Sequence, residues 1–393
     1  MKDYIVEKSK CCGCSACANA CPVGAITMHY DDEGFIYPVI NESCVDCGAC
    51  ERVCPIINAE KREYPEYLKT YAGYSTRDSV MANCTSGGFA TALSDIILDD
   101  GGVVYGVRYT DDYIKSEYVC VSSKDSLAAL MGSKYVQSEK GNVYRNVKET
   151  LKEGKKVLFV GCPCDVSALK LFLGKEYDNL YTCELVCMGV TSYRIAEEYK
   201  KYSEKKNKAK LVSVNARSKK HGWFVPTLEE KFDNGKTKYT TLFASYYGYG
   251  FQVYNRTSCF SCKYRDKNGA ADFRVGDFWG IKETDEFWNP NGVSCIFVRS
   301  EKGLELIPRF SDKGFKFYET DYKAATESNM SSLKNKSMHY VALRESFARV
   351  FKDKGLVPAC NATASLTFRL KRIIPQKMQS TLKKIYHKFV DKR

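Results

Sequence analysis

Two stretches near the start of the chain decide how it begins to fold: residues 11–22 read CCGCSACANACP and residues 44–55 read CVDCGACERVCP. In each stretch, four cysteines are spaced C-x2-C-x2-C-x3-C, and a proline follows the last of them. Two-residue gaps let successive thiolates converge on one cubane of iron and sulfide. The repeated run therefore predicts two 4Fe-4S clusters near the N-terminus.

This pair of runs has the spacing of the bacterial two-cluster ferredoxin, in which the fourth cysteine of each run ligates the other cluster. The first cluster is then expected on Cys11, Cys14, Cys17 and Cys54, and the second on Cys44, Cys47, Cys50 and Cys21. Zinc sites or a disulfide knot are the alternative, but zinc sites usually have longer insertions between their C-x2-C pairs. We predict a ferredoxin module over residues 1–60, with Cys12 as a structural residue outside the pattern.

The composition of the whole chain fits a protein of reducing surroundings. Its 393 residues leave room for one or two larger domains after the module, and a hydrophobic content of 44% is ordinary for globular proteins. Cluster ligands must be thiolates, so the remaining ones of the 19 cysteines are expected to be free thiols. The sequence shows no signal peptide and no membrane-spanning apolar run, and we expect a cytoplasmic protein.

Positive charge is concentrated at the end of the chain. The net charge is +13, and residues 361–393 contain nine Lys or Arg but a single acid, Asp391. Residues that recur there at helical spacing are Met378, Leu382, Ile385 and Phe389. A basic amphipathic helix can bind an anionic membrane surface or a partner, although a terminal helix packed on its own domain is the favoured interpretation. The rest of the chain is nearly balanced in charge, and we expect no nucleic-acid partner.

The chain after the module divides into a linker, a large domain and a tail. Residues 61–70 are charged and contain Pro65, which is typical of a linker. Strands and helices then alternate, with strands predicted over 103–107, 156–160, 180–186 and 293–298 and helices over 165–173 and 193–202. The alternation indicates an α/β domain over residues 71–355, followed by the basic tail over residues 356–393. The chain is thus expected to fuse an α+β ferredoxin-type module to a mixed α/β domain.

A second set of cysteines lies outside the module. Cys164 follows a predicted strand in a tight turn, Cys187 ends the next strand, and Cys259 and Cys262 form a C-x2-C in a basic loop. Because ligands collect at the carboxyl ends of strands in α/β sheets, these four thiols predict a third cluster. The alternative is that Cys164 and Cys187 are small buried residues and the C-x2-C is a zinc half-site.

Two short segments offer cradles for a phosphate group. Residues 85–88 (TSGG) precede an apolar helix that begins at Phe89, and small residues at a helix N-terminus expose N–H groups to an anion. Residues 132–135 (GSKY) combine a turn, a hydroxyl, a cation and an aromatic ring. A helix cap and an ordinary loop are the simpler interpretations. The chain has no G-x-G-x-x-G, so a Rossmann dinucleotide site is not predicted.

Several longer motifs occur in a familiar order. They are TSGGFATAL (85–93), GSKYVQS (132–138), VLFVGCPCDVSALK (157–170), LVCMGVTS (185–192), RTSCFSCKY (256–264) and DFRVGDFWGI (272–281). In this order they resemble the coenzyme F420 hydrogenase/dehydrogenase beta-subunit family, of which many members carry a two-cluster ferredoxin first. Members of that family are cytoplasmic flavoproteins that bind FAD and iron-sulfur clusters. They move electrons between the clusters and a hydride carrier or an organic substrate; one branch reduces coenzyme F420 and another a hydroxymethyl group on chlorophyll.

The resemblance implies a flavin-binding domain and indicates its residues. It implies cluster ligands at Cys164, Cys187, Cys259 and Cys262, and FAD contacts at Ser86, Gly87, Gly88, Ser133, Lys134 and Tyr135. The chain departs from the family where Cys162 replaces a usual Thr, Asp165 a frequent Gln and Met188 a frequent His. These departures surround Cys164 and the substrate side, so they bear on the identity of the reductant or substrate.

Together these features predict an iron-sulfur flavoprotein oxidoreductase. Electrons from a ferredoxin or another redox protein would pass through the clusters and FAD to a small-molecule acceptor, or in reverse. The acceptor would be coenzyme F420 or an organic, sugar-type substrate. Lys134 and His221 are the candidate catalytic residues, as electrostatic or proton partners. The alternative is an electron-transfer subunit of a larger redox complex, and the sequence leaves open a homo-oligomer and a membrane contact through the tail.

Overall fold

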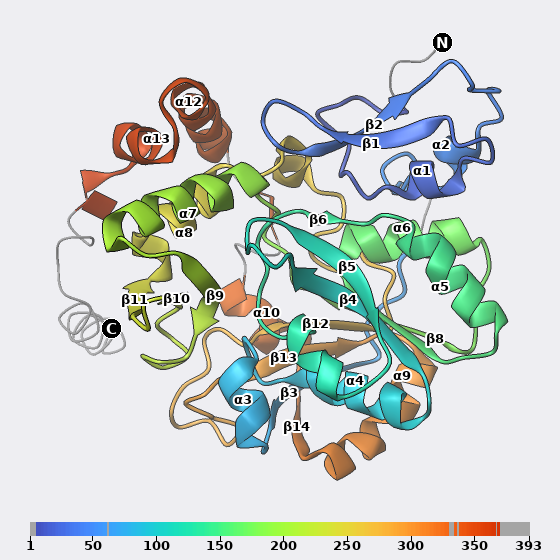
Figure 1. Cartoon of the computed structure of the whole chain (residues 1–393). Coiled ribbons are helices and arrows are strands. Elements are labelled where there is room, and N and C mark those ends of the chain that lie inside the picture. The colour runs from blue at the N-terminus through green and yellow to red at the C-terminus, as the bar shows by residue number, and fades with distance from the viewer. Residues whose placement is uncertain (1–4, 61–62, 330–333, 336–337, 367, 370–393) are drawn as a thin grey trace.

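The computed structural model describes residues 5–60, 63–329, 334–335, 338–366 and 368–369, and it begins with the predicted module. Strands β1 (Ile26–Tyr30) and β2 (Ile36–Ile40) form an antiparallel hairpin. Helices α1 (Ala16–Ala20) and α2 (Ala49–Arg52) each start inside one of the two cysteine runs. Figure 1 shows this module beside the large domain, where α1 packs on α5 and α6.

The two cysteine runs share an unusual backbone. Gly13 has φ +67° and Ser15 has φ +65°, while Asp46 has φ +50° and Gly48 has φ +68°. These residues occupy the same places in the two runs, 33 residues apart. The left-handed region favours Gly, Asp and Asn, so the sequence partly supplies the residues that this turn requires. The internal repeat is therefore a repeat of conformation as well as of cysteine spacing.

A nine-stranded mixed sheet forms the centre of the large domain. In sheet order its strands are β14 (Phe315–Thr320), β3 (Lys69–Ser75), β13 (Ser294–Val298), β12 (Phe273–Asp277), β8 (Leu180–Leu185), β7 (Val157–Gly161), β4 (Val103–Tyr109), β5 (Ser116–Val121) and β6 (Ser138–Glu139). The strands β12, β8, β7 and β4 run parallel, as expected where helices alternate with strands. The four strands predicted from apolar runs are confirmed, and the fold is mixed α/β. Strand β3 begins at Lys69, inside the segment 61–70 that was predicted as a linker.

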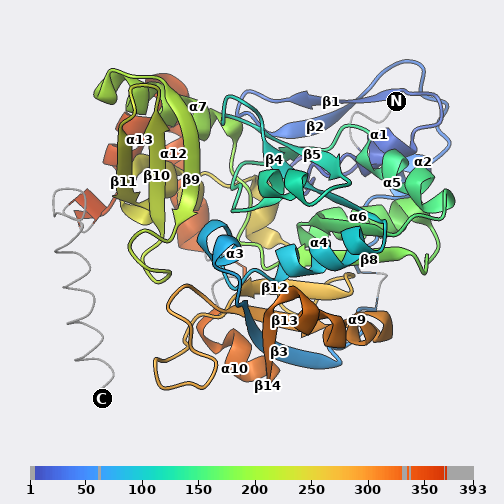
Figure 2. The same cartoon turned by 60° about the horizontal axis from the view of Figure 1, so that its bottom comes forward.

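Helices cover both faces of this sheet (Figure 2). On one face, α4 (Phe89–Asp99) and η4 (Ile307–Lys313) pack on Val104 and Leu158. On the other, α5 (Val143–Lys152) and α6 (Pro163–Leu173) pack on Val103, Val157 and Phe159, together with residues of the ferredoxin module. The alternation of side chains along each strand explains why the buried run at 157–159 serves both cores. The helix predicted over 165–173 is confirmed as part of α6.

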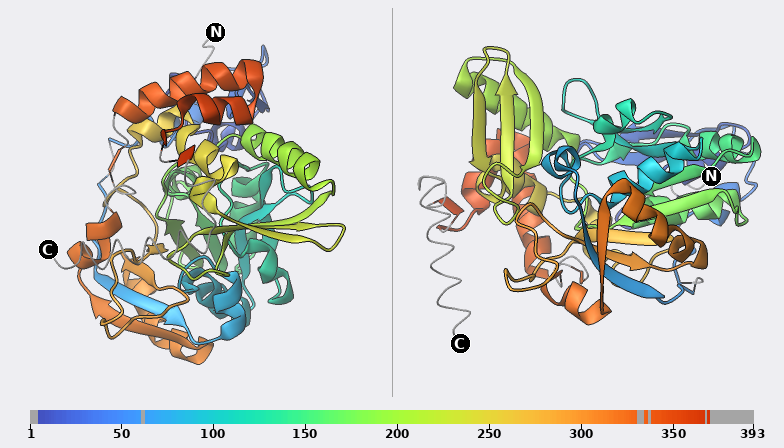
Figure 3. Two further views of the ribbon diagram at one scale, coloured as in Figure 1. Left: turned by 90° about the vertical axis from the view of Figure 1, so that its left-hand side faces the viewer. Right: turned by 90° about the horizontal axis from the view of Figure 1, so that it is seen from below.

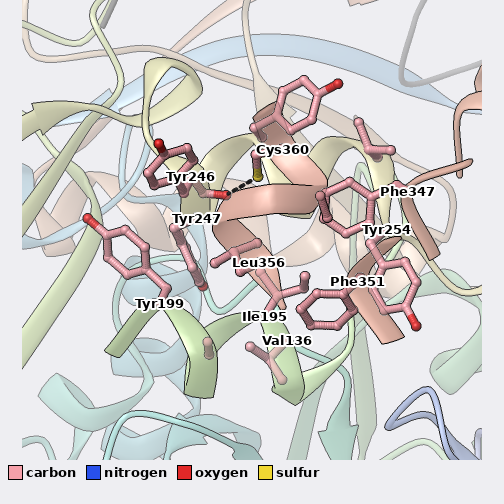
Figure 4. Close-up of a cluster of buried hydrophobic side chains, with 14 of the residues drawn as sticks. Val136, Ile195, Tyr199, Tyr246, Tyr247, Tyr254, Phe347, Phe351, Leu356 and Cys360 are labelled. Carbon is pink, nitrogen blue, oxygen red and sulfur yellow. Dashed lines mark hydrogen bonds between the residues drawn. The ribbon is translucent and has the colours of Figure 1, made fainter. Parts of the chain in front are cut away.

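A smaller sheet and four helices form a separate aromatic core. Its strands are β9 (Leu211–Ser218), β10 (Thr227–Phe232) and β11 (Thr237–Thr241), and its helices are α7 (Tyr193–Asn207), α8 (Tyr246–Val253), α12 (Met338–Lys354) and α13 (Leu356–Thr363). Figure 4 shows the packed rings of Tyr246, Tyr247, Tyr254, Phe347 and Phe351. Figure 3 shows the whole chain from two further sides. The first helix of the predicted tail, α13, is thus part of a core. Residues 370–393, with the predicted amphipathic face, lie outside the described residues.

The remaining elements are short. They are α3 (Asp78–Asn83), η1 (Asp125–Leu130), η2 (Leu242–Ala244), η3 (Thr257–Ser261), α9 (Glu301–Leu306), α10 (Tyr322–Thr326) and η5 (Glu327–Asn329). All 19 cysteines lie in the described residues, and none of them is in a disulfide there. Among the helices of the described residues, none has the length and apolar character needed to cross a membrane.

Candidate functional site

The second cysteine run surrounds a cavity at the surface of the module. The cavity has a volume of about 380 Å³ and is lined by the thiols of Cys21, Cys44, Cys47 and Cys50. These are the four ligands that crossed ligation predicts for one cluster. In the described part of the chain, no three His, Cys, Asp or Glu groups are placed to bind a single metal ion; these four cysteines instead line one cavity. The residues therefore fit a cubane cluster.

The four thiols predicted for the other cluster lie deeper in the module. Cys14 and Cys54 are buried, and Cys11 and Cys17 are half-buried. Burial raises the pKa of the Cys17 thiol, and the neighbouring Cys11 and Cys54 raise it further. Burial likewise raises the pKa of Cys54 to about 11. Thiolates in such surroundings are unfavourable without a metal to take up their charge, which is consistent with a buried cluster.

Cys12, which the cysteine pattern left out, connects this inner site to the large domain. Its thiol hydrogen-bonds to the thiols of Cys14 and Cys164. The carbonyl of Cys12 also accepts a hydrogen bond from Nε2 of Gln137, at 3.3 Å. Cys12 therefore lies between a predicted cluster ligand and the first turn of α6.

Three of the four cysteines predicted for a third cluster lie close together. Cys187 and Cys259 interact, and so do Cys259 and Cys262. The sulfur of Cys187 accepts a hydrogen bond from the backbone of Gly189, and that of Cys262 from Tyr264, each at 3.4 Å. Backbone N–H groups aimed at sulfur are a common way in which proteins stabilise cluster thiolates. These residues fit a cluster site.

Cys164 is the fourth cysteine of that set, but a second thiol, that of Cys162, lies beside one of the other three. The thiol of Cys162 hydrogen-bonds to Cys187, and this bond lowers the pKa of Cys187 to about 7. Cys164, at the start of α6, hydrogen-bonds to Cys12 instead. The thiols of Cys162 and Cys164 thus both lie between the inner site and the third set, and either is a candidate for the fourth ligand.

Buried charges that the sequence did not reveal lie beside these thiols. Lys140 and Asp165 form an ion pair with an N–O distance of 3.3 Å, and each side chain is 4% exposed. Burial raises the pKa of Asp165, and Lys140 opposes that rise. Arg265 donates to the carbonyls of Cys187 and Cys259. Such cations stabilise added negative charge, so they favour the reduced state of a cluster held nearby.

The two predicted phosphate cradles lie side by side. The hydroxyls of Thr85 and Ser133 are 2.9 Å apart. Helix α4 begins directly after Gly88, which has φ +87° and provides no side-chain cap. The first N–H groups of a helix need partners from outside it, so this terminus is suited to an anion.

The hydroxyl of Ser86 and the N–H of Gly87 hold the first cradle on the sheet. Ser86 Oγ donates to the carbonyl of Val293 at 2.8 Å, and Gly87 N donates to Ser294 Oγ at 2.9 Å. A Cβ atom on Gly87 would lie 2.2 Å from the carbonyl oxygen of Gly73, so only glycine fits there. These two groups therefore shape the cradle, and the start of α4 provides its open N–H groups.

Lys134 and Tyr135 occupy the second cradle. Lys134 Nζ donates to the carbonyls of Met131 and Gly132, at 2.7 and 3.2 Å. Burial lowers the pKa of Lys134 to about 7, and no carboxylate among the described residues offsets the cost of its charge. The ring of Tyr135 stacks on Phe251 with centroids 4.1 Å apart. The side chain of Lys134 is thus close to a change of protonation at neutral pH.

His221, the other predicted catalytic residue, is exposed. Its ring centroid lies 5.8 Å from that of Tyr239, and among the described residues none of its contacts reaches either cradle. Lys219, two residues earlier, does reach one: its Nζ donates to the carbonyl of Ser86 at 2.8 Å and lies 3.4 Å from the sulfur of Cys84. The sequence motifs did not include Lys219, although it directly follows a strand, where ligand-binding residues often lie.

A buried ion pair lies next to the cradles. Arg217 and Asp277 are 3.2 Å apart, and Asp277 also accepts a hydrogen bond from Trp223 Nε1 at 3.0 Å. The Trp223 ring stacks on Trp279 with centroids 4.9 Å apart. Arg217 also hydrogen-bonds to Tyr135, which connects this pair to the second cradle. Two of these residues, Asp277 and Trp279, belong to the motif DFRVGDFWGI, but their partners lie far away in sequence.

The third cysteine set and the second cradle are connected through the backbone. Thr191 N donates to the carbonyl of Tyr135 at 3.0 Å, and Gln137 N donates to the carbonyl of Thr191 at 2.9 Å. The segment that follows Cys187 therefore pairs directly with residues 135–137.

Comparison with known proteins identifies the family of the chain. The N-terminal and C-terminal regions of the family described as "Coenzyme F420 hydrogenase/dehydrogenase, beta subunit" match residues 70–143 and 154–321, respectively. The chain belongs to the coenzyme F420 hydrogenase/dehydrogenase beta-subunit family. A "4Fe-4S dicluster domain" matches residues 10–57, which include all eight cysteines of the two runs. This member of the family is therefore an iron-sulfur redox protein.

Two further proteins are similar to the chain. An uncharacterized protein of Methanocaldococcus jannaschii is 22% identical over 380 residues, which are 86% of this chain and 96% of that protein. A chain in the xenon-derivatized F420-reducing NiFe hydrogenase complex from Methanosarcina barkeri is 18% identical, with a TM-score of 0.47. That likeness covers 73% of this chain and 94% of the other, and the score marks it as a loose one.

Proposed function

We propose that the chain is an FAD-containing oxidoreductase in which electrons pass between the ferredoxin module and a flavin through a third cluster. The observation that carries this proposal is an unbroken series of contacts between the three sites. Arg256 and Tyr264, which flank the C-x2-C loop, donate to the carbonyls of Cys11 and Pro55 in the module. At the other end, Thr191 donates to Tyr135 in the second cradle.

The residues at the cradles suit the parts of FAD. The open N–H groups at the start of α4 and the cations Lys134 and Lys219 suit a pyrophosphate. When bound, FAD would convert single electrons from the clusters into hydride transfer to an organic acceptor. Lys134, with its pKa near 7, is suited to hold a proton or a charge beside the flavin. His221 lies on the surface beside Tyr239 and has no role in this proposal.

The acceptor that we propose is coenzyme F420 or an organic, sugar-type substrate. The family includes proteins that act on the coenzyme, and the residue departures at Cys162, Asp165 and Met188 lie near the third cluster rather than in the cradles. These two acceptors are distinguished by testing whether the anaerobic protein reduces the oxidised coenzyme F420 or oxidises the reduced form.

Iron and flavin content test the proposal. Anaerobically purified and reconstituted protein is expected to contain about twelve irons, eight in the module and four in the third cluster, with one FAD per chain. Protein that contains the irons but neither binds FAD nor shows its absorbance would overturn the flavin part. Protein with about eight irons would overturn the third cluster.

A matched pair of variants tests which thiol completes the third cluster. Cys164→Ala is expected to lower the iron content by about four per chain, whereas Cys162→Thr, which restores the residue usual in the family, is expected to keep it. A loss of four irons in Cys162→Thr alone would identify Cys162 as the ligand. Mössbauer or EPR spectra of each variant would identify which cluster is lost.

A further inference from the structure

The ferredoxin module has two faces that are related by its internal repeat. Cys12 in the first run corresponds to Val45 in the second, and Pro55 corresponds to Pro22. Cys12 and Pro55 contact the large domain, through Cys164 and Tyr264. Val45 and Pro22 line the cavity of the other cluster and are exposed. We call these the inner face and the outer face of the module.

The large domain holds its side of the module with cations. Arg256 Nε donates to the carbonyl of Cys11 at 2.6 Å, and Arg145 donates to the carbonyls of Asn19 and Cys21 at 2.6 and 3.1 Å. Further contacts of this kind come from Lys263 with Glu60, Arg344 with Glu33 and Arg194 with the carbonyl of Asp32. Inside its own chain, this module is therefore bound by basic groups of the large domain, together with the apolar packing of Cys14, Ala16 and Val53 on the core of α5 and α6.

The charge of the module explains this preference. Over residues 1–60 the sequence has nine acidic residues and four Lys or Arg, a net charge of −5, although the chain as a whole has a net charge of +13. Charged patches of opposite sign attract and orient two proteins before contact. The module thus has a negative net charge, whereas the whole chain has a positive one.

The outer face has an apolar centre and acidic residues around it. Val45 is 62% exposed and Val23 is 47% exposed, and both lie at the cavity of the second-run thiols. Cys44 and Cys47 are exposed as well. Nearby, Glu42 and Asp46 are exposed, and within the described residues neither forms a salt bridge. Among the described residues, the outer face therefore offers an apolar centre and carboxylates as the inner face does, but its one nearby cation is Arg52 of the module itself, which donates to the carbonyl of Cys47.

We infer that the outer face docks a separate one-electron carrier protein that presents an apolar centre ringed by Lys and Arg. The inference deepens the proposed function, since it rests on the module carrying electrons. On contact the carrier loses one electron and the module gains one, or the reverse, and no bond forms or breaks. An acidic carrier, such as a typical flavodoxin, would be repelled by Glu42 and Asp46.

Binding measurements on the anaerobic holoprotein test this inference. Two probes of opposite charge are cytochrome c, whose haem edge is ringed by lysines, and an acidic flavodoxin. Cytochrome c is expected to bind with an affinity that falls as the ionic strength rises, and flavodoxin is expected to bind more weakly. Calorimetry reports both affinities without any turnover.

Matched variants locate the binding face. Glu42→Lys is expected to weaken cytochrome c binding by about fivefold at low ionic strength, and Val45→Ser is expected to weaken it with little change in salt dependence. Asp46 has φ +50°, so Asp46→Asn is the charge change that its backbone tolerates. Asp32→Lys, at the far turn of the β1–β2 hairpin, makes the same charge change as Glu42→Lys and is expected to alter binding by less than about twofold.

Three outcomes would overturn the inference. They are an equal effect of Asp32→Lys and Glu42→Lys, tighter binding of flavodoxin than of cytochrome c, and a dimer at low salt that Glu42→Lys dissociates. The last would show that the outer face meets the basic surface of a second copy of the chain. Iron and FAD content are measured in every sample, so a protein without FAD would contradict the proposed function while the binding result still decides this inference.

Discussion

The two cysteine runs of the module have the same spacing and the same left-handed turns, yet they lie in different surroundings. The inner site is buried against α6 and the C-x2-C loop, whereas two of the outer thiols, Cys44 and Cys47, are exposed. The difference shows that one repeated unit serves two purposes. Its inner copy joins the module to the large domain, and its outer copy is where we propose that another protein binds.

The difference has a simple physical cause. At the inner face, buried or half-buried groups such as Arg256 and Tyr264 replace water at the backbone carbonyls of Cys11 and Pro55. A buried carbonyl without a partner is costly, so these contacts and the burial of the inner thiols require each other. At the outer face the carbonyl of Cys47 is served by Arg52, which is exposed.

The largest difference is expected from removing one ligand at the same place in each run. Cys14→Ala and Cys47→Ala should each lower the iron content by about four per chain. Cys14 is 7% exposed and packs with the core of α5 and α6, so its loss should lower the free energy of unfolding by about 2 kcal/mol more than the loss of Cys47. Iron analysis and anaerobic urea unfolding measure the two effects. Equal destabilisation would contradict the distinction between inner and outer sites.

The next largest difference is expected between two arginines that each donate to the carbonyl of a cysteine, Arg256 to Cys11 of the first run and Arg52 to Cys47 of the second. Arg256 has no exposed surface and its guanidinium lies 3.9 Å from the centre of the Tyr37 ring. Arg256→Ala should cost about 2 kcal/mol of stability, because it leaves buried carbonyls without a partner. Arg52→Ala should change stability by less than about 0.5 kcal/mol, since water can replace the exposed side chain. Urea unfolding measures both, and an intermediate value for Arg256→Lys would show that the forked geometry matters as well as the charge.

Lys134 in the second cradle provides a test of the proposed flavin site, which the inner face connects to the module. Burial lowers the pKa of Lys134 to about 7, and a phosphate binds only its charged form. As the pH rises through 7 the free protein loses this charge, so the affinity for FAD should fall by up to about tenfold per pH unit. In Lys134→Met the affinity should be weak at pH 6 and nearly independent of pH. Lys134→Arg, which stays charged, should bind tightly throughout, and a steep pH dependence in either variant would exclude Lys134 as its cause.

The smallest difference concerns the second residue of each run. Cys12 contacts two thiols on the inner face, and Cys12→Ser should cost about 1 kcal/mol because the hydroxyl is a poorer partner there. Val45→Ser removes only exposed surface and should leave stability within about 0.5 kcal/mol. Parallel thermal unfolding of the two variants checks the difference. A larger loss of stability in Val45→Ser than in Cys12→Ser would mean that the outer face is covered by another part of this chain.

Much of this arrangement could be predicted from the sequence, because some of its patterns are local. Cluster ligands have a spacing set by the cubane, and the cavity at Cys21, Cys44, Cys47 and Cys50 matches the set expected from crossed ligation. The buried run VLFV in residues 157–160 forms β7 because β-branched and aromatic residues suit a strand covered on both faces.

Other features could not be predicted, because they join residues that are distant in sequence. The contact of Arg256 with Cys11 spans 245 residues, and that of Lys219 with Ser86 spans 133. Lys140 and Asp165 are single charges whose pairing appears only when α6 packs beside the segment after β6. No local pattern marks such residues, whereas the fold explains each of them by its burial and its partner.

One measurement tests the central claim, which is that the inner site connects the module to the flavin. Stopped-flow spectroscopy can follow flavin reduction when the anaerobic protein is mixed with a reduced one-electron carrier protein. We predict that Cys14→Ala retains FAD but slows its reduction by more than about tenfold relative to the unmodified chain. Flavin reduction at an unchanged rate in Cys14→Ala, with the inner cluster missing, would contradict it.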